Sequence, residues 1–168
     1  MGYNGRTMSV AAPQIEVNIS VVVRPATPAD YDAAMRLFRY TMGENFTLLP
    51  ALWDEVCNAP NYRTLVGDDA EGVTIALAVV VVSDRIRLAA GLRRRRFHMD
   101  ELIVAPDYRS HGIGHQMLEH IRSLAAAEAP SYIIANCDFM NVAARRVYED
   151  AGLHLTPQGS DRFEIAFS

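Results

Sequence analysis

The sequence LIVAPDYRSHGIG, residues 102–114, decides the fold of this chain. An apolar run, Leu102 to Val104, precedes a turn that carries Gly112 and Gly114, and apolar residues at helical spacing follow. This order predicts a strand, a glycine-bearing turn and a helix that begins near Gly112. Glycine lets the backbone approach a ligand closely, and the first amides of a helix lack partners. The turn therefore predicts a phosphate or pyrophosphate site at residues 109–114.

Three phosphate-binding patterns compete for this turn. A Walker A loop needs a lysine that reaches the phosphates, and the chain contains no lysine. A dinucleotide fingerprint needs a third glycine where Met117 stands. The remaining pattern is R-x-x-G-x-G after an apolar strand, and residues 109–114 match it.

This loop resembles that of the GNAT N-acetyltransferase superfamily, and two other segments resemble it as well. Residues 141–152 match the motif N-x-x-A-x-x-x-Y-x-x-x-G, and residues 24–30 are similar to the family's opening strand and turn. The resemblance covers residues 20–168, with Ser110 standing where the family often has glycine. It implies an α/β (α+β) fold, in which a mostly antiparallel mixed sheet has helices on both faces. We expect one such domain over residues 19–168, after an N-terminal extension over residues 1–18.

Local patterns place the elements of this domain. Thr27, Pro28 and Asp30 have the spacing of a helix start, in which Thr27 is the N-cap. Strands are expected over 19–24, 62–66, 73–82, 97–104 and 132–136, with residues 85–88 doubtful. Helices are expected from Thr27 to about Met42 and over 48–57, 112–128 and 141–151, the last closed by Gly152. A final hairpin is expected around residues 157–159.

The resemblance implies acetyl-CoA as cosubstrate and a set of residues that bind it. The pantetheine arm is expected along Leu102, Ile103 and Val104, and Asn141 is expected to contact the same arm. The pyrophosphate is expected on the backbone of the loop, formed by Arg109, Ser110, His111, Gly112, Ile113 and Gly114. Tyr148 is expected to donate a proton to the departing CoA thiolate, the alternative being a core aromatic residue at helical spacing.

Acetyl transfer to an amine also needs a group that accepts the amine's proton. In a regular strand, His98 and Asp100 share a face and Glu101 points to the other, although a β-bulge would change these faces. We favour Asp100 as the base or as the organiser of a water, and His98 second. The alternative is a charge pair on the surface.

Composition and sequence patterns argue against nucleic acid, metal and membrane as partners. A net charge of −4 and a pI near 5.7 do not favour nucleic acid as a partner. Cys57 and Cys137 fit no metal spacing, and no metal is expected. Because no stretch has enough apolar residues to span a bilayer and no signal pattern is present, we expect no membrane partner and a cytoplasmic location.

Four consecutive arginines, Arg93 to Arg96, admit two interpretations. They form a solvated strand edge, or they bind an anion, either the 3′-phosphate of CoA or an anionic acceptor. Binding of RNA or an acidic partner by the same run is a third hypothesis, which predicts a steep dependence on salt.

The expected activity is therefore transfer of an acetyl group from acetyl-CoA to a primary amine of a small-molecule acceptor by direct attack. The alternative is a non-catalytic module that binds acyl-CoA on the same fold, since a fold does not fix a function. The sequence leaves the acceptor open, because Asp54, Glu55, Asp100 and Glu101 favour a cation whereas the arginine run favours an anion. Many members of the family pair, so a homodimer is a further expectation.

Overall fold

The computed structural model describes residues 19–138, 140–156 and 162–168. The expected extension over residues 1–18 and the tip of the expected C-terminal hairpin lie outside these ranges. The described residues form one seven-stranded sheet in the order β1-β2-β3-β4-β5-β7-β6. Within it, β4 and β5 are parallel and the other neighbouring pairs are antiparallel, as expected.

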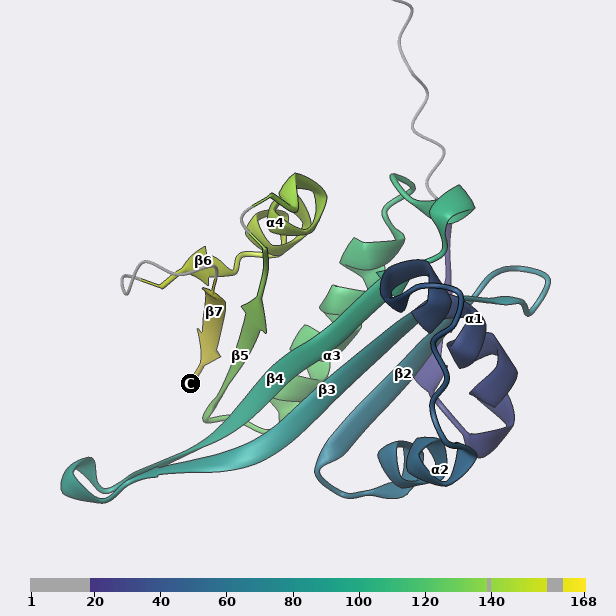
Figure 1. Cartoon of the computed structure of the whole chain (residues 1–168). Helices are drawn as coiled ribbons and strands as arrows, with labels where there is room; N and C mark the ends of the chain where they lie inside the picture. The colour runs from purple at the N-terminus through teal and green to yellow at the C-terminus, as the bar shows by residue number, and fades with distance from the viewer. Residues whose placement is uncertain (1–18, 139, 157–161) are drawn as a thin grey trace, which may run out of the picture.

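The elements follow one another in the order shown in Figure 1. They are β1 Val22–Pro25, α1 Tyr31–Met42, α2 Pro50–Asn58, β2 Tyr62–Asp68, β3 Thr74–Arg87, β4 Leu92–Val104, α3 Ile113–Ala127, β5 Ser131–Asn136, α4 Val142–Asp150, β6 His154–Leu155 and β7 Arg162–Phe167. The predicted helices and strands are present within a few residues of their expected bounds. The main difference is that β3 and β4 are longer than the apolar pattern indicated, and β3 takes in the doubtful residues 85–87.

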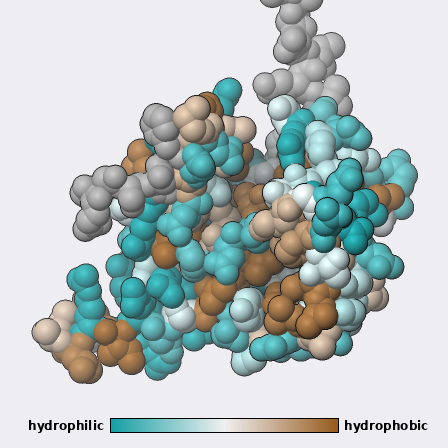
Figure 2. Space-filling view, viewed as in Figure 1, coloured by the Kyte–Doolittle hydropathy of each residue, from teal (hydrophilic) through white to brown (hydrophobic). Residues whose placement is uncertain are grey.

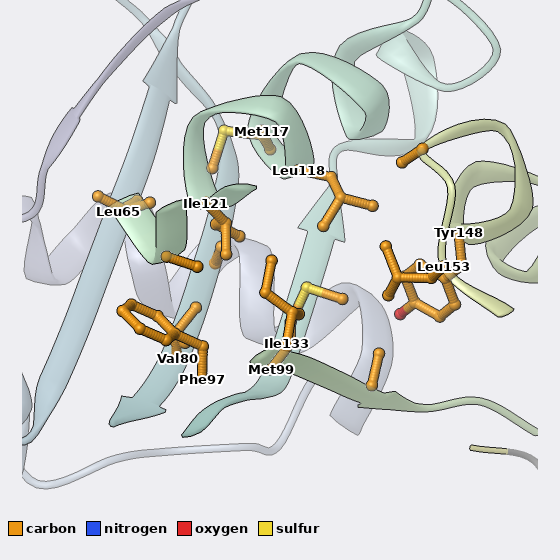
Figure 3. Packing of buried hydrophobic residues seen from close by; sticks show 14 of the residues in the cluster. Leu65, Val80, Phe97, Met99, Met117, Leu118, Ile121, Ile133, Tyr148 and Leu153 are labelled. Carbon is orange, nitrogen blue, oxygen red and sulfur yellow. The ribbon is translucent and has the colours of Figure 1, made fainter. Parts of the chain in front are cut away.

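Helices cover both faces of the sheet (Figure 1). On one face, α3 and α4 pack over a core that includes Phe97, Met99 and Ile133 (Figure 3). On the other face, α1 and α2 pack over a core centred on Trp53 and Leu77. Burial of these apolar side chains supplies the main driving force for packing the helices onto both faces of the sheet.

The predicted helix start is confirmed at the 3₁₀ turn Pro28–Asp30, which leads directly into α1. The Asp30 carboxylate accepts hydrogen bonds from the Thr27 backbone N–H at 2.7 Å and from the Thr27 hydroxyl at 2.8 Å. Arg24 binds the same carboxylate and also donates from Nε to Asp68 at 2.7 Å. These contacts join β1, β2 and the entry to α1.

The hairpin of β3 and β4 extends beyond the rest of the sheet as a two-stranded arm, residues 83–94. β2 pairs with β3 no further than Val81, and β5 pairs with β4 only from Arg95 onward. Ile86, Leu88 and Leu92 of the arm are exposed. Figures 1 and 2 show the arm at the lower left, with apolar residues at its end.

Among the helices that the structure describes, none is both long enough and apolar enough to cross a bilayer.

Candidate functional site

The candidate site lies where β4 and β5 separate. The two strands are paired from Arg95 and Ser131 to Met99 and Ala135. β4 then continues to Val104, whereas β5 ends at Asn136, and the two backbones diverge (Figure 1). The backbone of Leu102, Ile103 and Val104 on the β5 side therefore has no strand partner. An unpaired strand edge of this kind can pair with an extended, amide-bearing ligand.

The glycine-bearing turn forms one end of this opening. Ser110 and Gly112 both adopt left-handed backbone conformations, with φ of 63° and 76°, and Gly112 is the N-cap of α3. Within the described residues, the backbone amides from Ser110 to His115 have no hydrogen-bond acceptor. Amides at a helix N-terminus favour negative charge, because the helix dipole adds to their own.

Two side chains of the turn support an anion-binding role. Nδ1 of His111 is buried and has no hydrogen-bond partner in the part of the chain that the structure describes. The Arg109 side chain is exposed and donates from Nε to the Val104 carbonyl at 3.0 Å, which joins the end of β4 to the turn. Ile113 is fully buried and anchors α3, so it contributes its backbone to the turn. The chemistry of this donor set fits a diphosphate.

His98, Asp100 and Asn136 form a hydrogen-bonded chain at the point of separation. Nδ1 of His98 lies 3.0 Å from Asp100 Oδ1, and Nε2 of His98 lies 3.2 Å from Asn136 Nδ2. With the proton on Nδ1, His98 donates to Asp100 and its Nε2 accepts from the amide of Asn136. A carboxylate that orients an imidazole in this way is an arrangement suited to proton transfer.

A β-bulge at Asp100 corrects the expected faces of β4. Glu101 is opposite Val79 and Met99 is opposite Val80, so Asp100 has no partner of its own on β3. The extra residue puts Glu101 on the same face as His98, and the expectation that it points away is wrong. The sequence had left a β-bulge in this strand open, and the strand register now places it at Asp100.

Glu101 is half-buried beside the opening. Burial raises the pKa of its carboxyl group, and the Asp100 carboxylate raises that pKa further. Glu101 also acts electrostatically on the Tyr148 hydroxyl. It is thus a candidate site residue that was assigned no catalytic role from the sequence.

Tyr148 lies on α4, at the other side of the opening. It is buried beside Leu153 (Figure 3) and its ring packs against Phe163, with centroids 5.4 Å apart. Burial raises the pKa of Tyr148 to about 12, and the nearby Cys137 and Glu101 add to the effect. The phenol is therefore protonated at neutral pH and can donate a hydrogen bond.

Asn141 is the N-cap of α4, where its side-chain oxygen accepts from the Ala144 amide at 3.1 Å. The cap sets the position of the helix that carries Tyr148. Gly152 closes the same helix in a left-handed conformation, with φ of 80°.

The described residues contain no group of three or more histidine, cysteine or acidic side chains placed to hold a metal ion.

The chain was compared with known proteins. The model of the acetyltransferase (GNAT) family matches residues 31–153. Among curated proteins, no sequence matches the chain significantly.

Many solved structures share the fold. A mutant BH1408 protein of Bacillus halodurans has 23% identity and a TM-score of 0.69, over 80% of this chain and 94% of that one. A putative acetyltransferase of Salmonella typhimurium, yncA with its cofactor acetyl-CoA, has 17% identity and a TM-score of 0.68, over 89% and 95%. An aminoglycoside 6′-N-acetyltransferase of Acinetobacter baumannii has 12% identity and a TM-score of 0.67, over 82% and 92%.

Proposed function

Because the chain belongs to the GNAT acetyltransferase family, we propose that it transfers an acetyl group from acetyl-CoA to a primary amine of a small-molecule acceptor by direct attack. One observation carries the proposal: the opening between β4 and β5 has unpartnered amides at one end and proton-transfer groups at the other. The acetyl-CoA bound in the yncA structure, on the same fold, supports the choice of cosubstrate.

Different residues of the opening bind different parts of acetyl-CoA. The amides from Ser110 to His115 and the Arg109 side chain hold the diphosphate. The free edge of β4 at residues 102–104 pairs with the amide groups of the pantetheine arm. Bound in this way, acetyl-CoA supplies a thioester whose carbonyl carbon an amine can attack.

His98 and Asp100 together remove the proton of the acceptor amine. An ammonium ion must lose a proton before it can act as a nucleophile. Nε2 of His98 carries the lone pair that can take the proton when the amine replaces the Asn136 amide as its hydrogen-bond donor. Asp100 fixes the tautomer and stabilises the charge that forms on the ring. The geometry thus favours His98 as the proton acceptor and Asp100 as its positioning residue, the reverse of the order favoured from the sequence. Glu101, on the same face, attracts the incoming cation.

Tyr148 acts on the other reacting group. Its protonated hydroxyl donates to the sulfur as the C–S bond breaks, so that the departing thiolate does not carry an unscreened charge in a buried site.

Binding and turnover are tested separately. Acetyl-CoA should raise the melting temperature of the purified protein, and some member of a broad amine panel should cause release of free CoA. His98→Ala should lower turnover by about 10²- to 10⁴-fold with acetyl-CoA affinity unchanged. Stabilisation by acetyl-CoA without turnover on any amine favours the non-catalytic acyl-CoA-binding module, and no stabilisation by any acyl-CoA refutes both.

A further inference from the structure

The run of four arginines is divided by strand alternation into two pairs with different partners. On one face, Arg93 Nη2 lies 2.5 Å from Asp84 Oδ2, and Arg95 Nε lies 2.9 Å from Glu128 Oε2. On the other face, the Arg94 guanidinium stacks over the Tyr132 ring, 5.3 Å from its centroid. Arg96 on that face donates from Nε to the Ser83 hydroxyl at 3.1 Å. Neither Arg94 nor Arg96 forms an ion pair within the described residues.

Further uncompensated positive charge lies beside Arg94. Arg85 of β3 is directly opposite Arg94 of β4, and like charges in such positions repel. Arg87 follows two residues further along the same face of the arm. Within the described ranges, neither Arg85 nor Arg87 forms an ion pair. On this face of the arm, Arg85, Arg87 and Arg94 therefore form a cluster that no carboxylate of the arm balances.

These arginines line a hollow of about 1150 Å³ between the arm and the β6–β7 edge of the sheet. Its lining includes Arg85, Arg87, Arg94, Arg162, Tyr132 and Glu164. Arg162 forms an ion pair with Glu164 at 3.3 Å, while its Nε is buried with no hydrogen-bond partner among the described residues. Among the described residues that line the hollow, four guanidinium groups thus face a single carboxylate, and the buried Nε–H of Arg162 has no acceptor.

The hollow lies beside the candidate site. Arg162 is directly opposite Asn136 in the β5–β7 ladder, and the Asn136 amide contacts His98. At the far end, Arg94 precedes His98 by four residues on β4, which corresponds to about 13 Å of extended strand. Arg94 and His98 therefore lie on the same face of β4, with Arg96 between them.

We propose that the acceptor is an extended amine whose far end carries carboxylates, held by Arg85 and Arg94 while the amine lies at His98. The inference rests on the proposed function and specifies its substrate class. It accounts for both signs of charge in the sequence, because Asp100 and Glu101 face the cationic amine and the arginines face the anionic end.

The CoA 3′-phosphate does not explain the cluster. The turn that holds the diphosphate follows Val104, ten residues from Arg94 on the same strand, which is roughly 30 Å away. A coenzyme whose diphosphate lies at that turn and whose sulfur lies at Tyr148 keeps its nucleotide away from the arm.

The test compares two eight-residue peptides with free amino termini and small uncharged residues. One has glutamate at positions five and six, where an extended chain reaches Arg94, and the other has glutamine there. Binding is measured by fluorescence anisotropy of a C-terminal label, and turnover by release of CoA. We expect the glutamate peptide to bind about tenfold more tightly and to have the lower KM, with kcat similar for the two.

Arg94→Gln should remove this preference, whereas Arg93→Gln, one residue away on the opposite face, should preserve it. A thermal shift with acetyl-CoA checks that each variant is folded and reports on the proposed function independently. Equal binding of the two peptides, or equal loss in both variants, overturns the inference and leaves the acetyltransferase proposal intact. If a uridine oligonucleotide binds as tightly as the glutamate peptide, the surface binds polyanions in general. That result also overturns the inference. Failure of the unmodified protein to bind acetyl-CoA refutes the proposed function and the acceptor assignment together.

Discussion

The variant Tyr148→Phe tests how the Tyr148 hydroxyl acts on the departing sulfur. The hydroxyl either donates a hydrogen bond or transfers its proton completely. The substitution removes one hydroxyl and keeps the ring that packs on Phe163, so the fold should persist. The pKa of Tyr148 is about 12, whereas a thiol has a pKa of about 8.5. Against a thiol in water, complete transfer from phenol to thiolate is uphill by about three to four pKa units, or roughly 5 kcal/mol. This is an upper limit, because burial raises the pKa of the thiol as well.

The hydroxyl should therefore act mainly by donating a hydrogen bond to the developing thiolate. A hydrogen bond to a charged group contributes about 1.5–3 kcal/mol, which corresponds to a loss of roughly 10- to 150-fold in kcat. The KM for acetyl-CoA should change little, because the bond forms only as the sulfur becomes charged.

Steady-state CoA release measures kcat and KM for the parent and the variant, and chemical denaturation controls for stability. A loss above about 10³-fold would show that the proton is fully transferred, and the reasoning from the raised pKa would then be wrong. An unchanged kcat would show that the hydroxyl does not reach the sulfur at all.

Three further predictions concern stability and the anion-binding turn. The hydrogen-bonded Arg24 lowers the pKa of Asp30 to about 2, so Asp30→Asn should lose about 1–2 kcal/mol of unfolding free energy at pH 7. Because the folded pKa is depressed, this difference should disappear as the pH falls from about 4 to about 2, and urea titrations that show a constant difference would contradict the assignment. Ser110→Val places a β-branched residue at a φ of 63° and should cost about 1–2 kcal/mol and weaken acetyl-CoA binding, whereas Ser110→Gly should do neither. Gly67→Ala would bring a Cβ within 3.0 Å of Met117 Sδ and 3.2 Å of Ala76 Cβ, so denaturant unfolding should show a loss of about 1–3 kcal/mol, and full retention of stability would mean that this core has room to adjust.

The parts of the fold with local signals could be predicted from the sequence. The glycine spacing at residues 109–114 predicted a strand, a turn and a helix, and the structure has β4, the turn and α3 there. The capping residues at Thr27 and Asp30 likewise form the expected contacts. Such signals depend on backbone conformation within a few residues, which the side chains in that window determine.

Features that depend on strand register could not be predicted. The bulge at Asp100 changes the face of Glu101, yet bulges are set by pairing with β3 rather than by composition. The division of the arginine run also required the register, because only the cross-strand partners distinguish Arg93 from Arg94. The roles of Tyr148, His98, Asp100 and Asn141 stay predictions, and the variants Tyr148→Phe and His98→Ala test the first two.

The early end of the parallel ladder at Met99 and Ala135 has a consequence for hydrogen exchange. Past that point, no ladder protects the β5 side of β4, so its unpaired amides should exchange with deuterium faster than those in the paired part of the strand. A ligand that forms strand-like hydrogen bonds with this edge of β4 would slow the exchange of these amides. The protected amides would then map the path of the pantetheine chain through the sheet, residue by residue, without a crystal.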